Sequence, residues 1–339
     1  MDKSTSSKNM LKSLGITQLL ETDGLTEVAI NKPGEIWTEV DGQWQRHEAP
    51  AITHDSFHQL VNALAVYNGG YVNASQPIAS VTLPDGERGW IVMPPACAPF
   101  NCSLTIRKPS KKRFTLEDYR STGRFSAARE VEPRNDDIEP YQKKLKAAIQ
   151  ERDIETVFRM AADYRLNVLM GGGTGSGKTT SMKTLADLYP HDKRYLTLED
   201  SLELDLPNHP NHVRLLYSDV PGGVTSKKLI ESCMRMKPDH IFLTELKGDE
   251  TWSYLTLLNT GHNGSVTSSH FNNAASGHSR IADLVRQSPI GQTLDQDFIL
   301  STVRRTIDLV IFWDRTHLQE IYYNPEGQLR LARGEPYEG

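Results

Sequence analysis

The chain has 339 residues, of which 37% are hydrophobic and 24% charged, and its formal net charge at pH 7 is −5. This composition is typical of a soluble globular protein of about two domains, and the net charge gives no general reason to expect nucleic-acid binding. No apolar run approaches the ~18 residues that a transmembrane helix needs, and the polar start MDKSTSSKNM lacks the apolar core of a secretory signal. The three cysteines, Cys97, Cys102 and Cys233, form no C-x-x-C pair. Their number and spacing favour a reducing, cytosolic compartment and argue against a zinc module.

The first ~110 residues predict a small α+β domain. Short runs with alternating apolar residues are separated by turn residues, and one segment repeats its apolar residues at helical spacing. A helix placed between antiparallel strands is typical of an α+β module. The expected elements are three strands within 27–48, a helix over 57–64, a hairpin over 78–95 and a further strand over 102–109.

Residues 111–140 are expected to link this module to a second domain. The basic run RKPSKKR at 107–113 is interpreted as a solvated linker surface, and Thr115 and Asp118 have the spacing of a capping box for a short helix. The polar segment 126–140 follows. The predicted boundaries are therefore an N-terminal domain over 1–110, the linker over 111–140 and a second domain over 141–339.

From residue 141 helical patterns alternate with short apolar runs. Such alternation predicts a mainly parallel β-sheet covered by helices, which is an α/β fold. The apolar runs are YLTL (195–198), HIFLT (240–244), GSVTSS (264–269) and DLVIFW (308–313). The C-terminal segment 318–333 is expected to form an antiparallel hairpin that turns at 324–327.

A glycine-rich stretch near the middle of the chain fits the phosphate-loop pattern. An apolar run of strand length, 166–170, precedes it and a helical pattern follows it. Its backbone N–H groups can surround phosphates, Lys178 can contact the β- and γ-phosphates, and the Thr179 hydroxyl can ligate Mg²⁺. The predicted nucleotide-binding residues are Gly172, Gly173, Thr174, Gly175, Ser176, Gly177, Lys178, Thr179 and Thr180.

Acidic or imidazole side chains follow three of the apolar runs. Glu199, Asp200 and Glu203 follow the first, Glu245 the second and His270 the third. Because parallel strands end at one edge of an open sheet, we expect these groups to meet there. Each also has a structural interpretation: Glu199 and Glu203 as helix N-terminal charges or surface ion pairs, and His270 as a hydrogen-bonded structural histidine. Together with the phosphate loop, they favour a catalytic cluster.

The chain resembles the hexameric traffic ATPases of bacterial type IV secretion systems, in the superfamily that also powers type II secretion and type IV pili. Four boxes carry the resemblance: GGTGSGKTT (172–180), LTLEDSLEL (196–204), RMKPDHIFLTEL (235–246) and TGHNGSVTSSH (260–270). They correspond to the Walker A, Asp, Walker B and His boxes, and the Walker B box lacks the usual Asp. Lys247 stands where the family usually has Arg, and an ammonium group cannot make the bidentate contact of a guanidinium. The N-terminal segments 85–96 and 105–110 and the segment 206–217 are similar to the type IV secretion branch.

The resemblance implies a RecA-like ATPase domain and assigns roles to the residues of its boxes. Lys178 and Thr179 would contact phosphate and Mg²⁺. Glu245 would polarise the attacking water or hold the metal through water. Glu199 and Glu203 would support that cluster.

Three further residues obtain roles from the resemblance. His270 would contact or sense the γ-phosphate. Arg88 and Arg107 match N-terminal-domain arginines that reach the phosphates of the nucleotide, where developing negative charge attracts a guanidinium. The alternative for both arginines is a surface position with weak ion pairs. A site completed by both domains would make rigid-body domain motion the mechanical output.

The resemblance implies ATP hydrolysis that powers a type IV secretion system, with pilus assembly and translocation of protein or DNA–protein substrates, as in conjugation. The expected protein is a homohexamer that meets inner-membrane components and other ATPases of the machine, peripherally at the cytoplasmic face of the inner membrane. Three alternatives stay open. They are a type II secretion or pilus assembly or retraction ATPase, a nucleic-acid motor with the same core, and a small-molecule kinase. Three scattered cysteines cannot build the four-cysteine module common in type II assembly ATPases, and the net charge weakens the nucleic-acid alternative.

Overall fold

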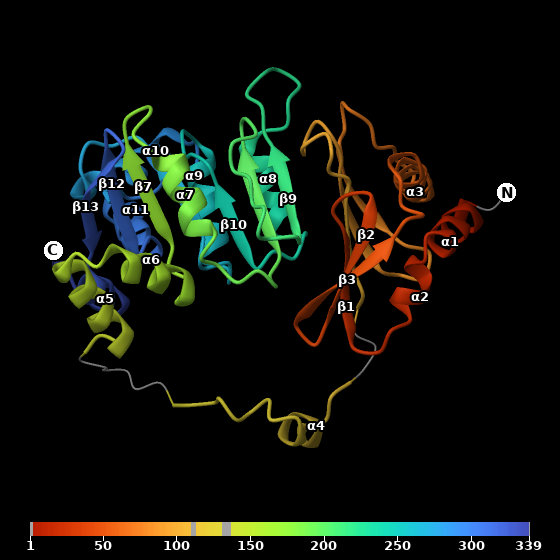
Figure 1. Ribbon diagram of the computed structural model, residues 1–339, viewed down its shortest axis with the longest axis horizontal. Coiled ribbons are helices and arrows are strands. Elements are labelled where there is room, and N and C mark those ends of the chain that lie inside the picture. Colours follow the sequence, from red (N-terminus) through yellow and green to blue (C-terminus); the bar gives the residue numbers. More distant parts are fainter. Residues whose placement is uncertain (1–2, 110–112, 131–136, 339) are drawn as a thin grey trace.

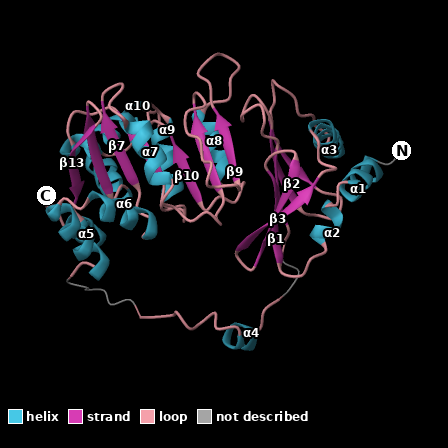
Figure 2. Cartoon of the chain, in the orientation of Figure 1, coloured by secondary structure: helices cyan, strands magenta, loops and turns pink. Residues whose placement is uncertain are grey.

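The computed structural model describes residues 3–109, 113–130 and 137–338, and these form two β-sheets with their helices (Figures 1 and 2). A six-stranded sheet belongs to the N-terminal part of the chain and a seven-stranded sheet to the C-terminal part. The predicted order, a smaller α+β domain before a mainly parallel α/β domain, is confirmed.

The N-terminal sheet is antiparallel, with strand order β3-β2-β1-β6-β5-β4. Its strands confirm the predicted run of three strands, hairpin and further strand, and the predicted helix is α3 (His54–Tyr67), which Thr53 caps. Two helices that the sequence pattern did not predict, α1 (Lys3–Ser13) and α2 (Ile16–Leu20), pack with α3 into the core of this domain. The strands are β1 (Leu25–Ile30), β2 (Gly34–Val40), β3 (Gln43–Ala49), β4 (Ile78–Thr82), β5 (Arg88–Val92) and β6 (Ser103–Arg107).

The C-terminal sheet has strand order β13-β12-β7-β11-β10-β8-β9 and is parallel except for β13. Its strands are β7 (Val168–Gly172), β8 (Tyr195–Glu199), β9 (His212–Leu216), β10 (His240–Leu243), β11 (Val266–Ser269), β12 (Leu309–Asp314) and β13 (His317–Tyr323). The predicted apolar runs correspond to β8, β10, β11 and β12. Strand β9, which lies at one edge, was not predicted.

Helices cover both faces of this sheet, so both faces are buried. Successive side chains of a strand point to opposite faces and therefore pack with different helices. In β7, Val168 and Met170 pack with one group of helices and Leu169 with the other. The first group is α5 (Pro140–Glu151), α6 (Ile154–Asp163) and α7 (Lys178–Ala186). The second is α8 (Ser226–Cys233), α9 (Glu250–Leu258), α10 (Gly277–Gln287) and α11 (Gln296–Thr306).

The predicted C-terminal hairpin is wrong. Strand β13 pairs with β12 through a turn at 315–316, and the segment expected to turn back begins a helix instead, α12 (Pro325–Ala332). The Asn324 side chain accepts a hydrogen bond from the Gly327 N–H at 2.8 Å, and Pro325 occupies the first helical turn. Asn at an N-cap followed by Pro is a helix start as well as a turn signal, and here the helix prevails.

The two sheets meet at strand β9. The Ala98 N–H donates to the Arg214 carbonyl at 2.9 Å, and the Leu216 N–H donates to the Ala96 carbonyl at 3.0 Å, so the N-terminal domain continues the hydrogen bonding of this edge. Fully buried Arg194, just before β8, donates to Asn31 at 2.7 Å and to Thr105 at 3.3 Å across the same interface. Pairing of the edge strand removes an exposed row of backbone groups and ties the domains together.

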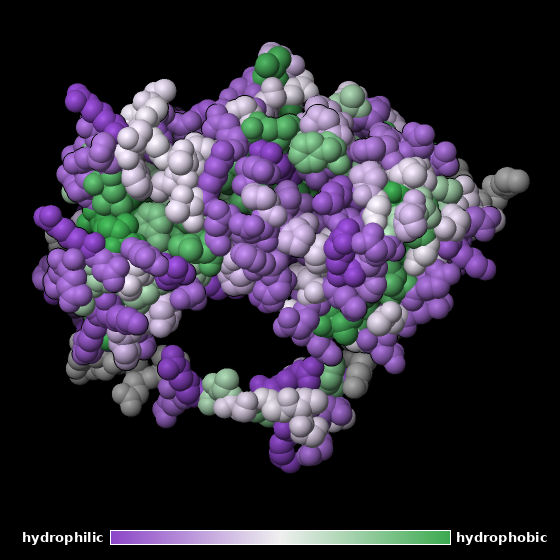
Figure 3. All heavy atoms as spheres, viewed as in Figure 1, coloured by the Kyte–Doolittle hydropathy of each residue, from purple (hydrophilic) through white to green (hydrophobic). Residues whose placement is uncertain are grey.

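The connection between the domains runs along the outside of the molecule (Figure 1). Its described part, 113–130, is almost entirely solvent-exposed and contains α4 (Leu116–Ser121), whose Thr115–Asp118 capping box was predicted. Residues 110–112 of the basic run and 131–136 of the predicted linker lie outside the described residues. The surface of this connection is mixed, with hydrophilic and hydrophobic atoms side by side (Figure 3), and its exposed hydrophobic side chains are Phe114, Leu116, Tyr119 and Phe125. Among the described residues, no helix has the length and apolar character to cross a membrane.

Candidate active site

The phosphate loop lies between β7 and α7, as predicted. Gly175 and Gly177 have φ values of 71° and 95°, which side chains rarely adopt. Gly172, with φ 145°, also has no room for a side chain, because a Cβ there would lie 2.3 Å from the Trp313 carbonyl oxygen. The Lys178 ammonium donates to the carbonyls of Gly172 and Gly173, both at 2.8 Å. The loop therefore curls around the lysine at the start of α7.

Burial lowers the pKa of Lys178 and the negative charge of Glu245 opposes this effect. An anion stabilises the charged form of a lysine that is partly desolvated, because its negative charge offsets the cost of burial. The loop is therefore electrostatically suited to phosphate.

Thr179 is brought together with Glu203. The Thr179 hydroxyl donates to the Glu203 carboxylate at 3.4 Å, and the Ser201 hydroxyl contacts the other carboxylate oxygen, also at 3.4 Å. Both residues of the Thr179–Glu203 pair are accessible to solvent. A hydroxyl and a carboxylate at this separation, with space for water, are the oxygen ligands that Mg²⁺ takes in nucleotide sites.

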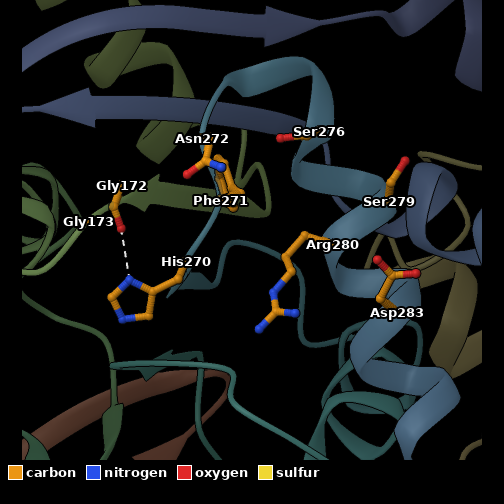
Figure 4. A pocket seen from close by; sticks show the side chains of 9 residues that line it. All are labelled: Gly172, Gly173, His270, Phe271, Asn272, Ser276, Ser279, Arg280 and Asp283. Atoms are coloured by element: carbon orange, nitrogen blue, oxygen red, sulfur yellow. Dashed lines mark hydrogen bonds between the residues drawn. The ribbon is translucent and has the colours of Figure 1, made fainter.

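Glu245 and His270 form the second part of the cluster. The His270 Nε2 lies 2.8 Å from a Glu245 carboxylate oxygen. Its Nδ1 lies 3.0 Å from the Gly172 carbonyl oxygen (Figure 4). His270 thus connects the carboxylate after β10 to the phosphate loop after β7. The Glu245 side chain is 22% exposed, so a water molecule can reach it.

Lys247, which replaces the usual arginine, contacts two carboxylates. Its ammonium lies 2.6 Å from Asp200 and 3.4 Å from Glu245. Although burial opposes the effects of these charges, the net result is a raised pKa for Lys247 and a lowered pKa for Asp200. The lysine therefore stays charged and bridges the loops after β8 and β10 with single contacts, where an arginine can make a bidentate one.

Glu199 is fully buried and its carboxylate accepts five hydrogen bonds. Arg214 in β9 donates two of them, at 2.9 and 2.8 Å, and the Thr197 hydroxyl one, at 2.6 Å. The backbone N–H groups of Glu203 and Leu204 supply the others, at 2.8 and 2.7 Å. Glu199 therefore supports the site by holding the turn that presents Glu203, and it is not exposed to a substrate.

Arg88 and Arg107 are cross-strand neighbours in β5 and β6, and both are exposed. The Arg107 guanidinium lies 3.8 Å from Glu27. Thr105, two residues earlier, contacts Arg194 at the amino end of β8, which is the edge opposite the phosphate loop. Three strands also separate β7 from β9, on which the N-terminal domain packs. Within one chain the structure does not bring these arginines to the loop.

A cavity of about 370 Å³ opens beside Gly172, Gly173 and His270. Figure 4 shows the Arg280 and Asp283 side chains extending from α10 on its other side. No sequence pattern predicted a role for these two residues or for Arg214. An amphipathic helix and a short edge strand contain charged residues for many reasons, so no sequence signal separates these from surface residues.

A phosphate loop, a hydroxyl–carboxylate pair and a solvent-accessible carboxylate at one edge of a mainly parallel sheet define the class of phosphate-loop ATPases. A family model described as "Type II/IV secretion system protein" matches residues 127–311. The type IV secretion system protein VirB11 of Brucella abortus is 36% identical over 92% of this chain and 89% of its own length. Protein VirB11 of Agrobacterium fabrum is 33% identical over 87% of this chain and 86% of its own length. The chain therefore belongs to the VirB11 family of type IV secretion ATPases.

The fold agrees with this membership. The crystal structure of the VirB11 ATPase from the Brucella suis type IV secretion system, in complex with sulphate, matches with a TM-score of 0.90 and 35% sequence identity. The match covers 97% of this chain and 98% of that one, so both domains and their relative placement are similar.

Proposed function

We propose that this chain hydrolyses ATP with Mg²⁺ through the cluster of Lys178, Thr179, Glu203, Glu245 and His270. The observation that carries the proposal is the convergence of these residues at one sheet edge, with Thr179 and Glu203 in contact and His270 joining Glu245 to the loop. Phosphoryl transfer needs mainly positioning and compensation of charge, and these groups supply both.

The residues fit a magnesium ion at Thr179. Its hydroxyl and the Glu203 carboxylate would supply two oxygen ligands, and both side chains are accessible to solvent. Glu245, through water, is the further ligand that the family resemblance implies. When bound there, the ion would supply positive charge that compensates the charge of the phosphates.

The protein groups then divide the work. The loop N–H groups and Lys178, released from its two carbonyl contacts, hold the phosphates. Glu245 orients the attacking water and accepts its proton, and His270, which contacts both that carboxylate and the Gly172 carbonyl, contacts or senses the γ-phosphate. Glu199 and Arg214 hold Glu203 in place.

We propose that Arg88 and Arg107 complete the site of a neighbouring copy in a homohexamer. Their place at the opposite sheet edge of their own chain supports this arrangement, because an exposed arginine there is free to meet another subunit. Charge on the transferring phosphate attracts guanidinium groups supplied from outside the nucleotide-binding domain. The same proposal places the domain boundaries at 110 and 140. It also includes movement of the N-terminal domain on the exposed linker.

The cellular role proposed for the chain follows its family. Hydrolysis would power pilus assembly and the translocation of protein or DNA–protein substrates, as in conjugation, with inner-membrane components and other ATPases of the machine as partners. The protein would be cytoplasmic and lie peripherally at the inner membrane.

The change Glu245→Gln tests the proposed mechanism. Glutamine keeps the shape but cannot accept a proton, so ATP should still bind while turnover falls by ~10²-fold or more. The measurements are steady-state hydrolysis and nucleotide affinity by titration calorimetry. Glu231→Gln, an exposed change on α8, is the matched control and should leave both values unchanged. Near-normal turnover in Glu245→Gln would contradict the proposed role, and loss of ATP binding would indicate that Glu245 mainly holds the metal.

A further inference from the structure

In strand β9, Arg214 directs both of its backbone polar groups to the N-terminal domain. Its N–H donates to the Asn101 side-chain oxygen at 3.1 Å, and its carbonyl accepts from the Ala98 N–H at 2.9 Å. Asn101 is itself buried, and its side-chain NH₂ group donates to the Asn31 carbonyl at 3.1 Å. Buried backbone groups need their partners, so the N-terminal domain fixes the backbone position of Arg214.

The Arg214 side chain extends the contact toward the candidate active site. Its guanidinium donates to both carboxylate oxygens of Glu199, at 2.9 and 2.8 Å. The Arg214 side chain is 8% exposed and that of Glu199 is fully buried, so water competes little with this pair. A planar guanidinium that meets both oxygens of a carboxylate has a fixed geometry. The position of Arg214 therefore determines the position of the Glu199 carboxylate.

Glu199 in turn locates the carboxylate that meets Thr179. Residues 200–206 belong to no helix or strand, so no ladder of backbone hydrogen bonds holds them. One Glu199 oxygen accepts from the N–H groups of Glu203 and Leu204, at 2.8 and 2.7 Å. The Glu203 carboxylate then accepts from the Thr179 hydroxyl at 3.4 Å. A continuous series of contacts thus joins the N-terminal domain to the proposed Mg²⁺ ligands.

We infer that Asn101 is a positioning residue of the active site, and that it sets the place of the Glu203 carboxylate through Arg214 and Glu199. The inference rests on the proposed ATPase function, in which Glu203 and Thr179 receive Mg²⁺. The N-terminal domain then serves the site of its own chain through buried hydrogen bonds. This contribution is separate from the arginines that are proposed to complete the site of a neighbouring copy.

Hydrogen–deuterium exchange of the full chain, without nucleotide or metal, tests the positioning directly. Asn101→Leu keeps the approximate size of the side chain and removes the acceptor of the Arg214 N–H. Exchange in peptides that cover 200–206 should become about three- to ten-fold faster, because their N–H groups lose a fixed acceptor. Thr105→Val is the matched control. It removes a buried contact of the same interface, to Arg194, without affecting Arg214, so exchange at 200–206 should stay as in wild type.

The Mg²⁺ requirement of hydrolysis is the second measurement. In Asn101→Leu the free Mg²⁺ concentration for half-maximal turnover should rise about three- to ten-fold, while the KM for ATP at saturating Mg²⁺ changes less than two-fold. Arg214→Lys keeps the charge, loses the bidentate contact and should raise the requirement by itself. Adding Asn101→Leu to Arg214→Lys should raise it less than two-fold further, because Asn101 acts through Arg214. If leucine prevents folding, Asn101→Ser, whose side chain is too short to reach the Arg214 N–H, should give the same results.

Three results would contradict these expectations. Wild-type exchange at 200–206, or an unchanged Mg²⁺ requirement, in a folded Asn101 variant would overturn the positioning role and leave the ATPase proposal standing. Effects of Asn101→Leu and Arg214→Lys that multiply in the double variant would overturn the route through Arg214. A wild-type chain that hydrolyses no ATP at any Mg²⁺ concentration would overturn the proposed function, and the role of Asn101 with it.

Discussion

Glu199 illustrates how a buried charge serves a site without facing the substrate. Its carboxylate is fully buried, and Arg214 contacts it through two nitrogens at 2.9 and 2.8 Å. A buried ion pair is maintained only when all its oxygens and protons find partners, and here the remaining capacity of the carboxylate is used by the backbone at 203–204. The main effect of this ion pair is therefore to fix the turn at 203–204, and its contribution to the stability of the fold is secondary.

Glu27, on β1 beside Arg107, should make stability depend on pH. Burial raises the pKa of Glu27 to about 7, and the Arg107 charge only partly opposes this. Its contribution is fully present below the unfolded pKa of about 4.5 and is lost as pH rises to about 7, because the unfolded chain ionises the group first. Glu27→Gln cannot ionise. The melting temperature of this variant relative to wild type should therefore increase between pH 5 and pH 8.

The measurement is thermal unfolding without nucleotide across this pH range. Glu48→Gln, an exposed change on β3, is the matched control and should show no such trend. A difference between Glu27→Gln and wild type that is flat from pH 5 to pH 8 would show that Glu27 is ionised throughout.

Strand β7 supplies more than the start of the phosphate loop. A Cβ on Gly171 would lie 1.8 Å from the ring of Phe271, the residue after His270. This close approach seats the loop after β11 against β7 and so places the His270 imidazole beside the loop. A glycine in a strand commonly marks such a contact.

Gly171→Ala tests this contact. The ring of Phe271 must move, so the free energy of unfolding should fall by ~1–3 kcal/mol, as is usual for overpacking. Hydrolysis should fall too, because His270 moves with its neighbour. Urea unfolding and steady-state turnover are the measurements. Gly70→Ala, where a Cβ would meet only one backbone oxygen at 3.9 Å, is the control. Wild-type stability and turnover in Gly171→Ala would show that Phe271 has room to adapt.

The arrangement of the whole molecule places the N-terminal domain on β9, with Arg107 toward the amino ends of the strands. If this arginine acts on a neighbouring copy, the loss of Arg107 and the loss of Lys178 affect different surfaces of a subunit. Two inactive variants should therefore complement each other.

Mixing tests this proposal. Arg107→Ala and Lys178→Ala should each be nearly inactive alone, because one lacks the supplied guanidinium and the other the lysine of the loop. Assemblies formed from both should recover part of the hydrolysis rate, with a maximum near equal proportions, since some sites then combine an intact loop with an intact arginine. The rate is measured against the mixing ratio, with assembly size checked by light scattering. Mixed assemblies without activity at any ratio would contradict completion by a neighbouring copy.

Local sequence patterns by themselves determined much of this protein. The phosphate loop from Gly172 to Thr180, the strands before it and after it, and the order of the four boxes are all local features, because glycine, apolar periodicity and turn residues act over a few positions. The prediction that the acidic and imidazole groups after β8, β10 and β11 lie at one edge of the sheet needed only one further rule, that parallel strands end at the same edge. The β3–β2–β1 meander was also predicted from its turns.

Only the tertiary structure decided which distant residues complete these patterns. Arg214 on Glu199, Lys247 on Asp200 and Trp313 beside the loop are contacts between segments 15 or more residues apart, and no short pattern specifies them. The C-terminal segment was predicted wrongly because Asn324 and Pro325 suit a turn and a helix start equally, and packing after β13 selected the helix. The edge on which the N-terminal domain lies, and therefore the position of Arg88 and Arg107, depends on the shape and burial of whole surfaces.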